Sequence, residues 1–126
     1  MVFVANDIHG GEDDRSPREM FQLYQSLVEN ILSRNPETPV FWIETTPTPS
    51  RWNVNPKARK ANKLIRDWSG ESEDLHFIST FDAFMTPELL PDSTYFREDM
   101  LHLNRKGYQQ WAEIILSSLE EAGVTP

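Results

Sequence analysis

The sequence predicts an α/β fold in which a parallel sheet is covered by helices on both faces. Three short apolar runs, at residues 2–5, 40–43 and 75–79, alternate with longer segments of helical periodicity. The first run ends at Asn6-Asp7 and a pair of glycines, as a buried parallel strand does where it turns into a loop. In such a sheet the site lies at the carboxyl ends of the strands, which places Asn6, Thr46 and the loop before His102 on one rim.

Composition narrows the possible functions. The chain has 126 residues, 38% hydrophobic and 25% charged, which suits one soluble globular domain. A net charge of -8 repels nucleic acid, and no apolar run reaches the ~20 residues of a membrane span, so we expect neither nucleic-acid binding nor membrane insertion. The chain has no cysteine and therefore no thiolate nucleophile. Because the first residues read as a strand, we expect no export signal, and the compartment stays open.

A helix is expected to begin at residue 17. Ser16-Pro17-Arg18-Glu19 offers a capping residue, a proline at the first helical position and a glutamate that can reach back to the cap, which together make a capping box. Pro36 and Pro39 end this helix. One apolar face of the helix carries Met20, Leu23, Tyr24, Leu27, Val28, Ile31 and Leu32.

The middle of the chain predicts a strand, a loop, a helix and another strand. Residues 40–43 are β-branched and aromatic throughout, as expected of a strand buried on both faces. The prolines of residues 45–49 take the chain out of the sheet as a loop. Asn55-Pro56 opens a helix for which Gly70 is a C-terminal cap, and residues 75–79 form the next strand.

The last third of the chain predicts irregular structure followed by a helix. Residues 81–98 show no sustained period and contain prolines, so we expect loops with a short turn of helix near Pro87. Asn104 can cap a final helix that ends at Gly123. The inward face of that helix is expected to carry Tyr108, Trp111, Ala112, Ile115 and Leu119.

The stretch Asp99-Met100-Leu101-His102 indicates chemistry. A carboxylate three residues before a histidine can accept the Nδ1 proton of the ring and leave Nε2 free as a base. This is two thirds of a catalytic triad, although a pair with this spacing is, by itself, more often structural. Trp52 lies in the loop after the second strand, where it could line a pocket for an acyl group or a sugar.

Blocks along the chain resemble those of the SGNH hydrolases, a family of GDSL-like lipases and acylhydrolases. Residues 96–108 are similar to the closing block of that family, an aspartate, two residues and a histidine, then Leu-Asn and Gly-Tyr before a helix. Residues 2–7 look like its third block, a strand followed by Gly-x-Asn-Asp, and residues 39–62 resemble the strand, proline loop and helix in between. The resemblance implies a three-layer α/β/α, flavodoxin-like SGNH fold.

The same resemblance implies a role for each matching residue. His102 would be the general base, Asp99 the carboxylate that orients it, and Asn6 a donor to the oxyanion, a contribution worth ~10²- to 10³-fold in turnover. The family acts on lipids, thioesters or acetylated sugars. We therefore expect a small-molecule ester as the substrate, with no cofactor and no metal.

Two departures from the family pattern limit this prediction. Val4 stands where the third block has glycine, and the opening Gly-Asp-Ser block, with its nucleophile, has no counterpart, so the chain reads as the C-terminal half of a domain truncated at its N-terminus. None of the ten serines lies on a strand-to-helix elbow, and Ser50 is the only one expected at the rim. We expect no esterase activity from this chain alone, and self-association through the open edge of the strand at residues 2–5.

Two alternatives use the same residues differently. A non-catalytic SGNH-like module could bind a ligand or partner at the site without converting it. A metal-dependent hydrolase could use Asp7, His9, Asp99 and His102, although the spacing around His9 matches no established set of ligands. The acidic residues 12–14 beside it are expected to form a solvated loop.

Overall fold

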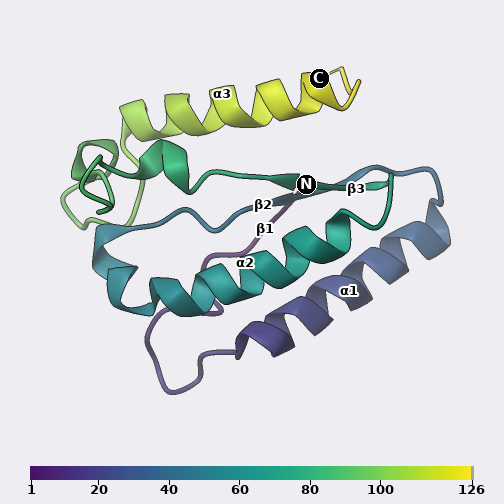
Figure 1. The fold of residues 1–126 in the computed structure, drawn as a ribbon, viewed down its shortest axis with the longest axis horizontal. Helices are drawn as coiled ribbons and strands as arrows, with labels where there is room; N and C mark the ends of the chain where they lie inside the picture. The colour runs from purple at the N-terminus through teal and green to yellow at the C-terminus, as the bar shows by residue number, and fades with distance from the viewer. Residues whose placement is uncertain (126) are drawn as a thin grey trace.

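The computed structural model of the protein describes residues 1–125 as a sheet between two layers of helices (Figure 1). The strands are parallel and adjacent in the order β1-β2-β3, and α1 and α2 cover one face while α3 covers the other, which confirms the predicted three-layer arrangement. Within these residues every helix is too short or too polar to cross a bilayer. The elements in chain order are β1 (Val2–Phe3), α1 (Pro17–Arg34), β2 (Val40–Ile43), α2 (Asn55–Ser69), β3 (Leu75–Ile78) and α3 (Arg105–Glu121).

Strand β1 is shorter than predicted and ends at Phe3 rather than at residue 5. Beyond it, the carbonyl of Val4 accepts a hydrogen bond from the Thr45 hydroxyl at 3.3 Å, so a side chain takes the place of the next ladder bond and the chain leaves the sheet. Within residues 1–125, β1 pairs only with β2. It is an edge strand whose other side carries unpaired backbone groups.

Helix α1 begins as its capping box predicts. The N–H of Glu19 donates to the Ser16 hydroxyl at 3.1 Å, and the N–H of Ser16 donates to the Glu19 carboxylate at 3.4 Å. Leu23 and Leu27 belong to the predicted apolar face but are 47% and 43% exposed, and they flank a shallow hollow beside the edge strand β1. The part of this face that is buried consists of Met20, Tyr24 and Val28.

Strand β2 forms the centre of the core, because all four of its residues are buried. On the side of α1 and α2, Trp42 packs against Tyr24 with ring centroids 4.7 Å apart. On the side of α3, Phe41 and Ile43 pack against Ile115. The alternation of side chains along a strand explains why one short segment contributes to both parts of the core.

A buried asparagine ties α2 to the end of β2. Asn62 is 2% exposed, and its side-chain oxygen accepts hydrogen bonds from Trp42 Nε1 at 2.9 Å and from the Thr45 N–H at 3.3 Å. Its amide nitrogen donates to the Ala58 carbonyl at 2.9 Å. These bonds fix the point at which the chain leaves the sheet and enters the loop at the rim.

The prediction of a short helical turn near Pro87 is wrong. This part of the chain folds back on itself instead: the N–H of Thr86 donates to the Leu90 carbonyl at 2.7 Å, and Met85 and Pro91 form an antiparallel bridge. Such pairing satisfies the backbone groups that a helical turn would otherwise use. The helical turns lie on either side, as 3₁₀ helices at Asp82–Phe84 and Ser93–Tyr95.

The prediction of the inward face of α3 is also wrong in part. Ile115 is buried, and Trp111 packs edge-on against Phe3 with ring centroids 5.5 Å apart. Tyr108 is 52% exposed, however, and Ala112 is exposed as well. Periodicity marked the apolar side of the helix correctly, but within residues 1–125 no element covers the strip that carries Tyr108 and Ala112.

Candidate active site

A cavity of about 370 Å³ opens at the carboxyl ends of β1 and β2. We call it the rim cavity. Asn6, Arg51 and His102 are among its polar residues, so two of the residues that the sequence singled out, Asn6 and His102, face one space. Most of the remaining wall is apolar, including Phe3, Ile8, Phe96, Leu101, Leu103 and Trp111. A concave, largely apolar space with a few polar groups is the usual form of a small-molecule site.

Asp99 and His102 form the hydrogen-bonded pair that the sequence predicted. Asp99 Oδ2 lies 2.5 Å from His102 Nδ1, while Oδ1 accepts the backbone N–H groups of Leu101 and His102, each at 3.0 Å. The hydrogen bond from His102, followed by the two backbone N–H groups, holds the pKa of the Asp99 carboxyl well below its usual range. With Nδ1 bound to a carboxylate, Nε2 is the ring nitrogen left to act as a base.

The turn between these two residues needs an unusual backbone conformation. Met100 has φ of 55°, in the left-handed region that non-glycine residues seldom adopt. This conformation lets one carboxylate reach two backbone N–H groups and the histidine ring together. The N–H of Ser50 donates to the Met100 carbonyl at 3.0 Å and stabilises the turn from outside. Strain of this kind, on the order of 1–3 kcal/mol, is commonly found at functional sites.

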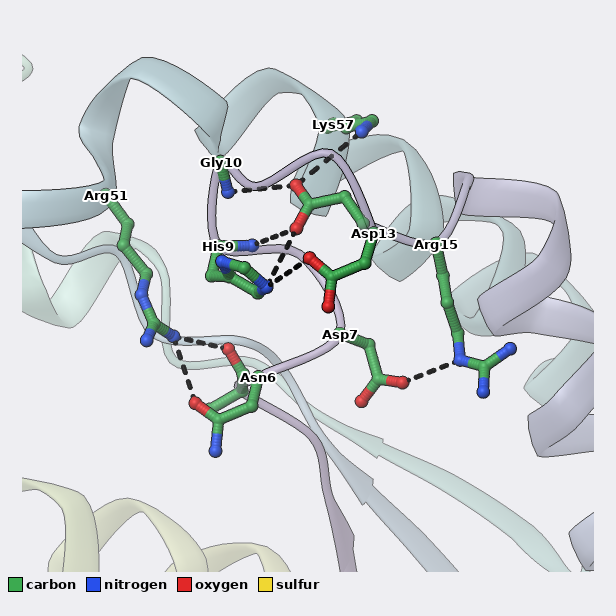
Figure 2. Close-up of polar contacts among 10 residues, drawn as sticks. Asn6, Asp7, His9, Gly10, Asp13, Arg15, Arg51 and Lys57 are labelled. Carbon is green, nitrogen blue, oxygen red and sulfur yellow. Dashed lines mark hydrogen bonds and ion pairs between the residues drawn. The ribbon is translucent and has the colours of Figure 1, made fainter.

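Asn6 is oriented by an arginine that comes from a distant part of the chain. Arg51 Nη1 donates to the Ala5 carbonyl at 2.6 Å and to Asn6 Oδ1 at 3.3 Å. Figure 2 shows the amide nitrogen of Asn6 turned away from the guanidinium group. Because Arg51 occupies the amide oxygen, the N–H₂ group of Asn6 is the part available to donate to a ligand.

The residues around the start of α3 are structural. The Asn104 side chain accepts a hydrogen bond from the Gly107 N–H at 3.0 Å and donates to the carbonyls of Thr94 and Phe96 at 2.8 and 3.1 Å. A Cβ atom at Gly107 would lie 2.3 Å from the Tyr95 carbonyl oxygen, so only glycine fits there without a shift of the backbone. Asn104 and Gly107 thus fix the start of the helix immediately after His102.

No serine lines the rim cavity in the part of the chain that the structure describes. Ser50, predicted at the rim, is exposed and contributes its backbone N–H to the Met100 turn. Three threonines line the cavity. Thr45 and Thr46 are engaged in hydrogen bonds, whereas the buried hydroxyl of Thr48 has no partner within the described residues.

Trp52 lies outside the lining of the rim cavity. Its ring stacks on Phe81 with centroids 6.4 Å apart and an interplanar angle of 27°. The tryptophan that lines the cavity is Trp111, which the sequence suggested only as a core residue of α3. A strand-to-loop position alone does not determine which way a side chain points.

In the acidic loop Glu12 and Asp13 are exposed, as predicted, whereas the Asp14 side chain is buried. This side chain is 2% exposed and accepts the backbone N–H groups of His9 and Gly10 at 2.8 and 2.9 Å. These bonds, the one from His9 foremost, lower the pKa of the Asp14 carboxyl. Lys57 on α2 lies 3.6 Å from the same carboxylate. Asp14 therefore closes the loop on itself and ties it to α2.

The metal set considered from the sequence does not assemble. Asp7 is bound by Arg15 at 2.9 Å, and Asp99 is bound by His102. Within residues 1–125, the one group of three or more metal-binding side chains whose ligand atoms lie within 4.8 Å of one another consists of His9, Asp13 and Asp14. The hydrogen bonds of Asp14 within the loop explain why these three side chains lie close together.

The chain resembles known proteins both in sequence pattern and in fold. Residues 2–110 match the model of the GDSL-like lipase/acylhydrolase family. The structure of a candidate platelet activating factor from Streptococcus pneumonia is similar with a TM-score of 0.72 and 21% identity, covering 94% of this chain and 57% of that chain. The esterase domain of the ZfL2-1 ORF1 protein from the zebrafish ZfL2-1 retrotransposon gives a TM-score of 0.70 and 23% identity, covering 84% of this chain and 64% of that one. No curated protein matches the sequence.

The match to the family model covers most of the chain. The chain spans less than two thirds of either solved structure, and at this level of identity the likeness is one of fold. The match to the family model extends over Asn6, Asp99 and His102 alike. The chain therefore belongs to the GDSL-like lipase/acylhydrolase family.

Proposed function

We propose that this chain carries part of the active site of an acylhydrolase that acts on small-molecule esters. His102 is the general base, Asp99 orients it, and Asn6 donates a hydrogen bond to the oxyanion. The serine nucleophile comes from sequence outside these 126 residues, as the missing Gly-Asp-Ser block of the family suggests. The observation that carries the proposal is the 2.5 Å contact between His102 Nδ1 and Asp99 Oδ2 at the wall of a cavity that Asn6 also lines.

The chemistry of each group suits these roles. His102 Nε2 would take the proton of the serine hydroxyl as the serine attacks the ester carbonyl, and would then return it to the leaving alcohol. The Asp99 carboxylate stabilises the imidazolium formed in between. The N–H₂ group of Asn6 would meet the negative charge that develops on the carbonyl oxygen. The apolar wall would hold the carbon chain of the acyl group or of the alcohol.

The chain alone should lack turnover. Losing the serine of a triad costs ~10⁶-fold in rate, and the hydroxyls that line the rim cavity belong to threonines and a tyrosine. Among the described residues, none of these hydroxyl groups is hydrogen-bonded to His102. The chain is then one part of a domain whose remainder packs beside β1.

The open side of β1 should also favour self-association. Phe3, Leu23 and Leu27 are all more than two fifths exposed near this edge. An apolar edge strand pairs readily with another strand, and a second copy of the chain supplies one. This association would be the consequence of an uncovered edge rather than a part of the chemistry.

A non-catalytic binding module is the second candidate, favoured by a preformed cavity of about 370 Å³ without a serine in its wall. Chemical rescue separates the two. Ethanol added as an external nucleophile should accept the acetyl group of p-nitrophenyl acetate faster in the presence of the chain than with either His102→Ala or Asn6→Ala. Saturable binding of ester analogues without any acceleration that depends on His102 would support the binding module instead.

A further inference from the structure

One short segment contacts both halves of the rim. The 3₁₀ helix Pro49–Val54 follows β2 and contains the two residues that make these contacts. The backbone N–H of Ser50 donates to the Met100 carbonyl in the turn that carries His102. The next residue, Arg51, donates to the Ala5 carbonyl and to the Asn6 side chain. The relative position of Asn6 and His102 is thus set by this segment as well as by the sheet.

The contact with Arg51 also selects one of the two orientations of the Asn6 amide. A guanidinium group has N–H donors and no acceptor, so it can bind the oxygen of an amide but not its N–H₂ group. Rotation of the amide by half a turn would bring donors against donors and lose the bond at 3.3 Å. Asn6 is exposed, and within residues 1–125 its side chain has no other hydrogen-bond partner, so Arg51 is what distinguishes the two orientations.

Arg51 itself is well placed for this task. Its 2.6 Å bond to the Ala5 carbonyl fixes the guanidinium against the backbone next to Asn6. Arg51 lines the rim cavity, and within residues 1–125 it forms no ion pair with a carboxylate. Its positive charge therefore stays available at the edge of the space where an oxyanion would form.

We propose that Arg51 is a positioning residue, which holds the Asn6 amide so that its N–H₂ group points into the rim cavity as an oxyanion donor. The role of Asn6 as a donor rests on the proposed function, whereas its placement by Arg51 is a separate property of the folded chain. The two can therefore be tested separately. Both hydrogen bonds come from one atom, Nη1, and the side chain of lysine, which is one bond shorter, does not bring an N–H donor to that point.

The test measures the order of the Asn6 side chain in the full 126-residue chain by ¹⁵N relaxation of its N–H₂ group. Arg51→Met removes the contact, and Arg51→Lys keeps the positive charge on a side chain that is one bond shorter. Arg34→Met is the matched control, because Arg34 is exposed and its side chain forms no hydrogen bond or ion pair with the described residues. The backbone spectrum of each variant shows whether it is folded. If Arg51→Met does not fold, the test is made on Arg51→Lys alone.

The Asn6 order parameter should be near ~0.85 in the unmodified chain and in Arg34→Met, and should fall below about 0.6 in both Arg51 variants. An Asn6 amide that stays equally ordered in a folded Arg51 variant overturns the proposal. Order retained only in Arg51→Lys would also overturn it, since the positive charge rather than the two hydrogen bonds of Nη1 would then be responsible. Loss of order together with an Asn6→Ala variant that leaves the ethanol rescue unchanged would keep the placement and reject the proposed function.

Discussion

His102 Nδ1 lies 2.5 Å from Asp99 Oδ2, and the two residues are only three positions apart in the chain. The left-handed backbone of Met100 makes this possible, because it curls the turn so that the Asp99 carboxylate also accepts two backbone N–H groups. The side chains of His102 and Asp99 are 64% and 47% exposed, so the pair faces the solvent rather than the core. It is a preformed and accessible base.

The pair should make stability depend on pH in the acid range. The pKa of the Asp99 carboxyl is lowered by the hydrogen bond from His102. A carboxyl group whose pKa is lower in the folded state stabilises the fold above its unfolded pKa, near 3.8. This stability is lost as the pH falls through the folded pKa. Between about pH 5 and about pH 2, the free energy of unfolding should therefore fall more steeply for the unmodified chain than for Asp99→Asn. Urea titrations followed by circular dichroism at stepped pH measure this.

The control for that experiment is Glu98→Gln, which changes the neighbouring exposed carboxylate without touching His102. Its pH profile should run parallel to that of the unmodified chain. Parallel profiles for Asp99→Asn as well would mean that the Asp99–His102 bond does not form in solution.

Gly107→Ala should destabilise the fold by about 1–3 kcal/mol, because the added methyl group would lie 2.3 Å from the Tyr95 carbonyl and push the start of α3 outward. Gly70→Ala is the matched control, since the closest atom to a Cβ there is 3.5 Å away and φ is -67°. Gly70→Ala should be neutral or slightly stabilising. Equal midpoints of thermal unfolding for the two variants would contradict the close approach at Gly107.

Asn62→Ala should cost about 2–5 kcal/mol, since it leaves Trp42 Nε1 and the Thr45 N–H without their shared acceptor. Trp42 fluorescence should shift as its ring loses that partner. Asn30→Ala, at an exposed position on α1, should change the free energy of unfolding by less than about 0.5 kcal/mol. A small effect at Asn62 would show that water replaces its hydrogen bonds.

The open edge of β1 predicts an oligomer that depends on concentration. Leu23→Gln with Leu27→Gln removes exposed apolar surface beside this edge and should shift the chain toward monomer in analytical ultracentrifugation. Leu89→Gln changes a residue that is 75% exposed in the turn before Pro91, away from the edge, and should have no effect. A monomeric unmodified chain, or an equal shift with Leu89→Gln, would exclude self-association through β1.

Local signals predicted most of the helices and strands. The Ser16–Glu19 capping box and the Asn104 cap each join residues three positions apart, so the local sequence is enough to predict them. Strand β2 was found because its residues are apolar throughout. The same holds for the Asp99–His102 pair, whose partners are near in the chain and need no tertiary contact to be recognised.

Features that depend on distant contacts were missed. The contact of Arg51 with Asn6 joins residues 45 positions apart, and no local pattern indicates it. Glu12 and Asp13 are exposed, as a solvated acidic loop predicts, but the Asp14 side chain is buried beside Lys57 of α2, and no local pattern indicates that contact. The exposure of Tyr108 depends on which elements lie beside α3, whereas periodicity reports only that one side of the helix is apolar.

Hydrolysis of p-nitrophenyl acetate by the purified chain, beside His102→Ala, tests most directly whether these residues hold the base without the nucleophile. We expect the two proteins to show the same slow background rate in water, and a size-exclusion estimate of mass would identify the species measured. Steady turnover by the unmodified chain that disappears in His102→Ala would contradict this, because it would show that the 126 residues hydrolyse an ester without the missing serine block.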